Sequence, residues 1–581
     1  MWGVWHGDPR YGQGHKRKRH GMTDATATTS STNGRPSAVH YLALVLFCLF
    51  AFVPGIASLP PTDRDESRFV QSTKQMVESG DFVDIRLQDE PRYKKPAGIY
   101  WLQSAAVLLS GKGADAPVWV YRTVSVAGAT LAVLAIAWLG SFMFGRTAGL
   151  IAGFGLAGIV MLAFEARMAK TDATLLATAL LAQAALARVY LGHKKSLPQG
   201  WAPWLFWIAQ GAGILIKGPV VPAVSALTVA SVAFFDKDRK WLKGLRAGPG
   251  VLIAILVAAP WLALITWRSG AEFWQESLGR DFLGKVGSGQ ESHGFPPGYY
   301  VLLFSLTFWP FAVPAIGAGL NALNRFRTDP RLLFCLAWYL PYWIVVELMP
   351  TKLPHYMLPA FPALLLLMAW GFMEGETGTA GLRRWQVWLY RATVFGAVLV
   401  TVLLAAIAIG VTPYVLGTIS WWGVLAAALI ILAGWTASGI RPAFAPLQRI
   451  VLAAVSAAAA MGMLTTFVVP GLTPVWLSPE IAREFAAVKP CPESRLISAG
   501  YHEPSLVFLA GTNTLLTDGA TAAAELGKDA CAVALISDDQ LEAFDGSLAE
   551  GASSIEELGR VTGVNYSKGT ERVLTFFGQA R

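Results

Sequence analysis

The sequence predicts an α-helical polytopic membrane protein with a small C-terminal α/β domain. Apolar residues make up 54% of the 581 residues and charged residues only 15%, with a mean hydropathy of +0.46. Soluble domains carry about 25% charged residues, so this composition excludes an ordinary soluble protein. Apolar stretches of about 18 residues or more, the length that crosses a bilayer, recur through residues 38–475 and then stop.

Roughly thirteen of these stretches are predicted to span a membrane. They lie near residues 38–59, 117–144, 147–164, 171–192, 201–216, 219–235, 249–267, 298–319, 331–349, 355–373, 387–410, 418–438 and 448–470. Residues 1–37 contain the basic run KRKRH and are predicted to be a disordered cytoplasmic N-terminus. With the N-terminus inside, the odd number of spans places the C-terminal domain, residues 476–581, outside.

The distribution of charge separates the two sides of the predicted membrane. The net charge of +9 comes from 47 basic and 38 acidic residues, and basic residues beside spans orient a membrane protein, so nucleic acid is not an expected partner. The predicted outer loops nevertheless contain DRDESRF, RYKKP, EARMAKTD, IKGP and MPTKLPHY. Because the positive-inside rule disfavours basic groups there, a shared anionic ligand is the expected reason for them.

The stretch DRDESRF supplies the candidate catalytic acids. Asp65 and Glu66 precede apolar residues at helical spacing, which predicts an interfacial amphipathic helix. A carboxylate at the start of a helix often only caps it. At the mouth of a membrane cavity, however, it can accept a proton from an acceptor hydroxyl, so Asp65 is a candidate general base.

Lysines recur at the outer ends of the predicted spans. They are Lys94, Lys95, Lys217, Lys285 and Lys352. A single lysine in such a place commonly snorkels to the headgroups. Several on one side predict an electropositive pocket for a lipid phosphate.

One outer loop contains candidate metal ligands. Asp281 and His293, with Glu291 close by, could supply a divalent metal site, although the same residues occur in ordinary polar loops. Their spacing is not diagnostic of either.

The C-terminal region has the composition of a small α/β domain. SRLISAG, SLVFLAG, ACAVALIS and ERVLTFFG are predicted strands, and SIEELGRV is a predicted helix. Its glycines form no phosphate-binding pattern, so nothing indicates nucleotide binding. Cys491 and Cys531 could form a disulfide if this region lies in an oxidising compartment.

Five motifs together resemble the bacterial aminoarabinose transferase family, which is related to the protein O-mannosyltransferases and shares their GT-C membrane fold. The motifs are DESRF, YKKPAGIYWLQ, the TD at 171–172, IKG at 216–218 and KLPHYMLPAFPAL at 352–364. The resemblance covers about residues 40–370. It implies a GT-C catalytic domain over residues 38–475, with a catalytic periplasmic loop at 60–116. It further implies sugar transfer from polyprenyl (undecaprenyl) phosphate to lipid A or another envelope glycan or protein, at the outer face of a bacterial inner membrane.

The resemblance also assigns residues. It implies Asp65 as the catalytic carboxylate, with Glu66 and Asp172 as further acids. It implies a contact from Lys95 to the lipid phosphate. It further implies Arg68, Lys217 and Tyr356 as phosphate ligands, and Lys352 lies in a matching motif. Lys94 and Lys285 are candidate phosphate ligands from the pattern of lysines at the span ends.

Two departures from the family pattern limit these implications. Lys94 stands where the family carries Glu, so the resemblance does not specify aminoarabinose as the sugar. Asp281 and Phe282 stand where the family has Glu-His, so no metal cofactor is expected to be required.

The expected reaction is a single displacement that inverts the anomeric carbon. Two other classes of membrane protein remain compatible with the sequence. A polytopic transporter should show repeated halves and charges near the midplane, whereas a non-catalytic lipid-binding protein should tolerate the loss of Asp65.

Overall fold

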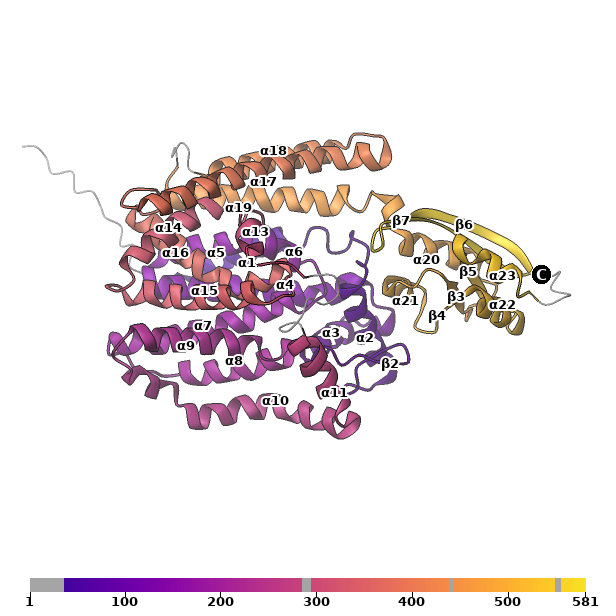
Figure 1. The fold of residues 1–581 in the computed structure, drawn as a ribbon, viewed down its shortest axis with the longest axis horizontal. Helices are drawn as coiled ribbons and strands as arrows, with labels where there is room; N and C mark the ends of the chain where they lie inside the picture. Colours follow the sequence, from indigo (N-terminus) through magenta and orange to yellow (C-terminus); the bar gives the residue numbers. More distant parts are fainter. Residues whose placement is uncertain (1–35, 285–293, 439–443, 549–554, 581) are drawn as a thin grey trace, which may run out of the picture.

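The structure is a computed structural model that describes residues 36–284, 294–438, 444–548 and 555–580. A large body of roughly parallel helices has a smaller α/β domain at one end (Figure 1). The helices of the body are α1 (Ala38–Phe52), α4 (Val118–Phe144), α5 (Arg146–Gly158), α6 (Val160–Glu165), α7 (Asp172–Lys194), α8 (Ala202–Lys217), α9 (Val220–Phe235), α10 (Ala247–Ser269), α13 (Tyr299–Thr307), α14 (Ala312–Arg325), α15 (Pro330–Leu348), α16 (Phe361–Glu374), α17 (Arg384–Leu416), α18 (Trp421–Ser438) and α19 (Pro446–Met463).

Among the described residues, eight helices are long and apolar enough to cross a membrane. The helical polytopic class is therefore confirmed, but the count of thirteen spans is not. Two predicted spans are interrupted. Residues 147–164 divide into α5 and α6 at Ile159, whose backbone is extended, and residues 298–319 divide into α13 and α14 around Pro310, which cannot donate a backbone hydrogen bond.

Helix α7 occupies the centre of the body, between α4 and α8. Its close approach to α4 depends on Gly128, because a Cβ added there would lie 2.9 Å from the Cα of Thr174. Small residues at such a contact allow two backbones to pack tightly. This packing fixes the N-terminal end of α7, where Asp172 begins the helix.

Short elements cover the end of the body that bears the catalytic motifs. They are α2 (Asp65–Ser79), β1 (Arg86–Leu87), β2 (Glu90–Pro91), α3 (Gly98–Leu109), η1 (Gly113–Asp115), α11 (Glu272–Trp274), η3 (Gln275–Leu283) and η4 (Pro354–Ala360). Helix α2 confirms the amphipathic helix predicted after DRDESRF. Asp65 is its first residue, while Arg64 holds the N-cap position with a φ of 67° and makes no side-chain cap.

The C-terminal domain is a five-stranded sheet with short helices. Its strands are β3 (Leu496–Ala499), β4 (Leu515–Thr517), β5 (Val533–Ser537), β6 (Ile555–Asn565) and β7 (Thr570–Gln579), in the order β4-β3-β5-β7-β6. β3 pairs in parallel with β4 and β5, and β7 pairs antiparallel with β5 and β6. The helices are α20 (Leu477–Val488), α21 (Pro504–Ala510), α22 (Gly519–Lys528) and α23 (Leu541–Asp545).

Two predicted elements of this domain were wrong. SLVFLAG forms α21, because Pro504 at the first position starts a helix and the apolar residues that follow are buried. SIEELGRV lies mainly in β6, because it pairs along its length with β7 across the turn at Gly569. The glutamates at its start resemble a helix pattern only because that part of the strand is exposed to solvent.

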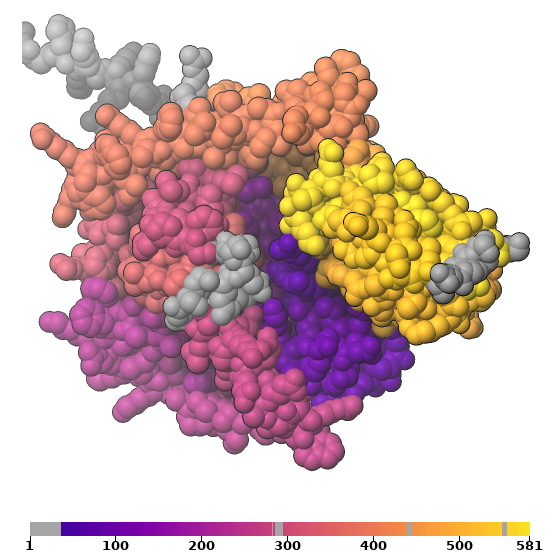
Figure 2. Space-filling view, turned by 45° about the vertical axis from the view of Figure 1, so that its right-hand side comes forward, coloured from indigo at the N-terminus to yellow at the C-terminus, as the bar shows by residue number. Residues whose placement is uncertain are grey.

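The C-terminal domain packs against the N-terminal part of the chain (Figure 2), where it contacts the loop before α2. The amide of Asp63 donates to the hydroxyl of Tyr566 at 2.6 Å, and Arg64 donates to the carbonyl of Ser567 at 2.9 Å. The Ser505 hydroxyl donates to the Asp63 carboxylate. The domain is thus joined directly to the residues that precede Asp65.

Candidate active site

Two of the three predicted catalytic acids, Asp65 and Asp172, meet at a cavity of about 310 Å³, at the N-terminal end of α7 and the C-terminal ends of α8 and α15. A cavity of this size holds a small ligand such as a sugar phosphate. Its charged and aromatic-polar lining consists of Asp65, Arg68, Arg92, Lys94, Lys95, Lys170, Asp172, Lys217, Asp281, Tyr342, His355 and Tyr356. Its apolar lining includes Leu175, Val220, Val345, Val346 and Met349.

Asp65 presents its carboxylate to this cavity from the first turn of α2. Partial removal from water raises the pKa of this carboxyl, but Lys170 and Arg92, among other nearby cations, outweigh that effect and hold the pKa below its ordinary value. Asp65 is therefore ionised at neutral pH. An ionised carboxylate can orient a hydroxyl and accept its proton.

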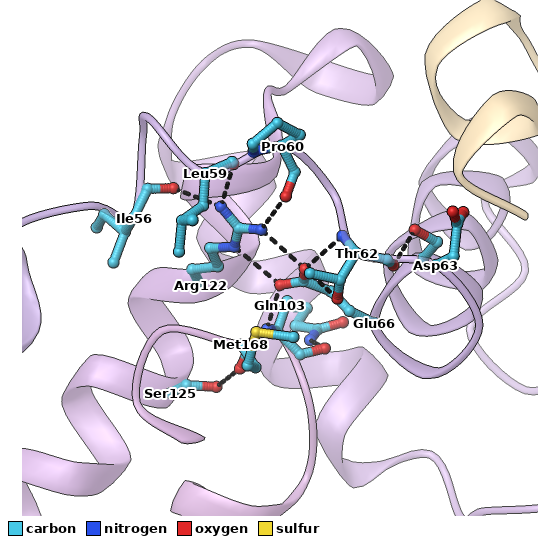
Figure 3. A network of polar contacts seen from close by, with 12 residues as sticks. Ile56, Leu59, Pro60, Thr62, Asp63, Glu66, Gln103, Arg122, Ser125 and Met168 are labelled. Carbon is cyan, nitrogen blue, oxygen red and sulfur yellow. Dashed lines mark hydrogen bonds and ion pairs between the residues drawn. The ribbon is translucent and has the colours of Figure 1, made fainter. Parts of the chain in front are cut away.

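Glu66 does not line the cavity. It lies in a network of polar contacts with Arg122 and Thr62 (Figure 3). It is 1% exposed and forms an ion pair with Arg122 at 2.7 Å. Its carboxylate also accepts from the amide of Ala169 at 2.7 Å and that of Thr62 at 3.0 Å. The prediction that Glu66 is catalytic is therefore corrected: its hydrogen bonds occupy it fully, and it acts as a positioning residue that ties the Asp65 loop to the segment before α7.

Asp172, Lys217 and Tyr356 come together as predicted. The Lys217 ammonium is 2.6 Å from the Asp172 carboxylate and lies 5.8 Å from the centre of the Tyr356 ring. These residues come from α7, the end of α8 and η4, which are far apart in sequence. A cation held between a carboxylate and an aromatic face is well placed to receive a phosphate oxygen.

Lys95 and Asp281 form an ion pair across the cavity. Asp281, predicted as a metal ligand, thus has a lysine beside its carboxylate. The other predicted ligand, His293, lies outside the described residues, as does Lys285. The metal site proposed for this loop stays a prediction.

Lys352 does not line the cavity. Its side chain is 1% exposed, and its ammonium donates to the carbonyl of Met349. The sequence-based assignment of Lys352 to the lipid phosphate is therefore corrected, because this bond turns the ammonium into the end of α15. Arg68 and Lys94 do line the cavity, as predicted.

Sequence reasoning missed three residues at or beside the site, Glu165, Lys170 and His355. Lys170 lines the cavity, and His355 stands between Glu165 and Asp172, 3.8 Å from each. The motifs EARMAKTD and KLPHY contain all three residues. The signal was present, but only the folded chain shows that these motifs converge.

One group of side chains in the described residues has the composition of a metal site. Glu165, Asp172 and His355 each offer an atom within 4.8 Å of the others. Lys170 lies 3.0 Å from Glu165, however, and Lys217 lies 2.6 Å from Asp172. Because two ammonium groups already neutralise the two carboxylates, this set does not fit a divalent cation.

Comparisons with known proteins agree with this architecture. A family model for dolichyl-phosphate-mannose-protein mannosyltransferase matches residues 94–264. The undecaprenyl phosphate-alpha-4-amino-4-deoxy-L-arabinose arabinosyl transferase of Aeromonas hydrophila is 26% identical over 405 residues, covering 68% of this chain and 71% of that protein. The enzyme of the same name from Pectobacterium atrosepticum is 27% identical, and the match covers 63% of this chain and 65% of that enzyme.

A solved structure shows the same fold. The crystal structure of ArnT from Cupriavidus metallidurans bound to undecaprenyl phosphate matches with a TM-score of 0.68 and 19% identity, covering 93% of this chain and 97% of that one. The relatives, the family model and the shared fold together support a membrane glycosyltransferase of the GT-C class. Within that class the chain is aminoarabinose transferase-like, which confirms the resemblance predicted from the motifs.

Proposed function

We propose that this enzyme transfers a sugar from a polyprenyl phosphate, such as undecaprenyl phosphate, to lipid A or another acceptor of the cell envelope. The observation that carries the proposal is the placement of Asp65 among cations in a cavity that is partly lined by apolar side chains. The apolar lining suits a prenyl chain and the cations suit its phosphate. The carboxylate suits an acceptor hydroxyl.

The transfer is a single displacement. Asp65 takes the proton of the acceptor hydroxyl as the acceptor oxygen bonds to the anomeric carbon. The bond from that carbon to the phosphate oxygen breaks, and the lipid phosphate leaves with the electron pair. Lys95 and Lys217 stabilise the negative charge that develops on the phosphate, and this interaction strengthens in the transition state. Attack opposite the leaving group inverts the anomeric carbon.

We place the site at the periplasmic face of an inner membrane. Cys491 and Cys531 form a disulfide in the C-terminal domain, with their Cα atoms 5.5 Å apart. Disulfides persist in oxidising compartments. Because this domain contacts the Asp65 loop, both belong on the same side of the membrane.

We propose that the reaction needs no metal cofactor. Lys170 and Lys217 already supply positive charge beside Glu165 and Asp172. These lysines, with Lys95, replace the charge stabilisation that a divalent cation would give to a leaving phosphate.

A transfer assay tests the function. Purified protein is mixed with a sugar-linked polyprenyl phosphate and lipid A, and the mass gain of lipid A is measured. Asp65→Asn should lower the rate by about a hundredfold or more. Asp115→Asn, an exposed acid of the same outer region, is the control and should keep the wild-type rate. A lipid A mass gain that does not depend on Asp65 would favour a lipid-binding protein over an enzyme.

A further inference from the structure

Arg64, the residue directly before Asp65, has a backbone conformation that residues other than glycine rarely adopt. Its φ is 67° and its ψ is −101°. Such a conformation costs free energy, persists only where the surrounding structure holds it, and is typical of functional sites. Because this conformation sets the direction in which the chain enters α2, it also sets where the Asp65 carboxylate points.

The groups that hold this conformation come from the C-terminal domain. The amide of Asp63 donates to the Tyr566 hydroxyl at 2.6 Å, and the Arg64 guanidinium donates to the Ser567 carbonyl at 2.9 Å. Both acceptors lie in the turn 566–569, which joins β6 to β7. Two successive residues before Asp65 are thus bound by one short turn that lies 503 positions further along the chain.

The turn 566–569 is firmly supported within its own domain. Asn565 is 3% exposed, and its side-chain amide donates to the Glu503 carboxylate at 3.0 Å. The carbonyl of Asn565 accepts from the amide of Gly569 at 2.8 Å. The Tyr566 ring packs edge-on against Trp476, with 5.7 Å between the ring centres. Because these contacts fix the Tyr566 hydroxyl within the domain, the hydroxyl can in turn fix the loop.

The helical body holds Asp65 from the other side only. Glu66 is tied to Arg122 by the buried ion pair and accepts from the amide of Ala169. With this anchor alone, Arg64 would return to an ordinary negative φ, and the chain before Asp65 would change direction. A small displacement of a catalytic group costs much of its rate.

We propose that the turn 566–569 of the C-terminal domain is a positioning element of the active site, which aims Asp65 through Tyr566 and Arg64. This inference rests on the proposed function and deepens it. Neither Tyr566 nor Arg64 lines the cavity. They act on the reaction through Asp65, so their loss should lower the rate of the chemical step without weakening the hold on the lipid phosphate.

The first test is lipid A transfer by full-length Tyr566→Phe, which keeps the ring and removes the hydroxyl. The kcat should fall by about tenfold, the range of one hydrogen bond. The KM for the donor and the retention of polyprenyl phosphate in native mass spectrometry should stay at wild-type values, because Lys95 and Lys217 come from other elements. A wild-type kcat in Tyr566→Phe would overturn the inference, even if the melting temperature falls.

The second test compares two variants of Arg64 that both remove its bond to Ser567. Arg64→Ala keeps a Cβ and therefore still disfavours a φ of 67°, whereas Arg64→Gly adopts this φ readily. The kcat of Arg64→Gly should therefore exceed that of Arg64→Ala by about fivefold or more. Equal kcat values in the two variants would overturn the inference, because the backbone conformation would then have no effect on catalysis.

Gln88→Met is the matched control, because Gln88 joins the first outer loop to the same domain at another place. Its side-chain amide donates to the carbonyls of Thr512 at 3.2 Å and Thr514 at 2.5 Å. The variant removes both bonds and leaves the turn 566–569 intact, so it should keep the wild-type kcat. If Gln88→Met lowers kcat as much as Tyr566→Phe, docking in general is responsible and the role assigned to the turn is wrong.

If wild type transfers no sugar, the proposed function fails, and hydrogen exchange of the segment 62–68 decides the inference separately. Faster exchange of this segment in Tyr566→Phe, with wild-type exchange in Gln88→Met, supports a turn that holds the loop. Equal exchange in wild type and Tyr566→Phe overturns it.

Discussion

Arg122 and Glu66 form a fully buried ion pair, 2.7 Å long, next to the loop that carries Asp65. Arg122 uses every one of its donors, because it also reaches the carbonyls of Ile56, Leu59 and Pro60 (Figure 3). The pair joins the end of the first helix, the start of α2 and α4. It thereby fixes the position of Asp65 without touching the cavity.

Removing one partner of this pair should destabilise the protein. Arg122→Met leaves the Glu66 carboxylate buried without its counter-charge, which should cost about 3–5 kcal/mol. Thermal unfolding in detergent measures the change. Lys112→Met is the control, because it removes an exposed cation near the same loop and should leave the midpoint unchanged. If Arg122→Met unfolds at the same temperature as the wild type, the ion pair does not stabilise the loop.

Docking of the C-terminal domain should weaken as pH rises. Burial raises the pKa of Asp63 from its ordinary 3.8 to about 6, against the opposing effect of the Ser505 hydrogen bond. The docked state therefore favours the protonated acid. Its stabilisation is fully present below pH 3.8 and is lost as pH rises through about 6.

Hydrogen exchange of the segment around Asp63 between pH 4 and pH 7.5 measures this effect. The Asn side chain of the Asp63→Asn variant cannot ionise, so its docking should not depend on this group. The protection of wild type, compared with that of Asp63→Asn at the same pH, should therefore fall as pH rises. Asp545→Asn, an exposed acid of the same domain, should follow the wild-type profile. Identical profiles for wild type and Asp63→Asn would contradict the assignment.

The thiol count should reflect a single disulfide. Cys48 and Cys335 are buried free thiols, whereas Cys491 and Cys531 are joined. Protein denatured without reductant should therefore label at Cys48 and Cys335 alone, and reduction should add the other two. Labelling of all four cysteines without reductant would contradict both the disulfide and the oxidising compartment.

A strong chelator should leave the transfer rate unchanged. Lys170 and Lys217 occupy the carboxylates that would otherwise hold a divalent cation. The measurement is lipid A transfer before and after chelation and dialysis. Loss of activity that zinc or manganese restores would contradict the proposal that the reaction needs no metal.

Local patterns in the sequence predicted the parts of the site that depend on short segments. The apolar spacing after Asp65 predicted α2, and the resemblance of short motifs brought Lys95, Lys217 and Tyr356 to one cavity. The roles of Glu66 and Lys352 could not be predicted in this way. Each depends on whether a side chain turns towards the cavity or away from it, which is decided by packing against distant helices.

The C-terminal domain was less predictable for a related reason. The strand β6 carries charged residues that suit a helix, and only its pairing with β7 fixes the extended form. The burial of the Arg92 Nε could not be predicted from the sequence either, because it depends on how the loop that carries Arg92 folds over Phe69.

Native mass spectrometry of the detergent-purified protein tests the central claim most directly, namely that cations hold a lipid phosphate while Asp65 performs the chemistry. Wild type and Asp65→Asn should both retain a polyprenyl phosphate or its glycosylated form, and Lys95→Ala should lose it. Lys112→Ala, an exposed lysine of the same outer region, should retain it. Equal retention by all four proteins, or no prenyl lipid in any of them while other lipids survive, would contradict the account.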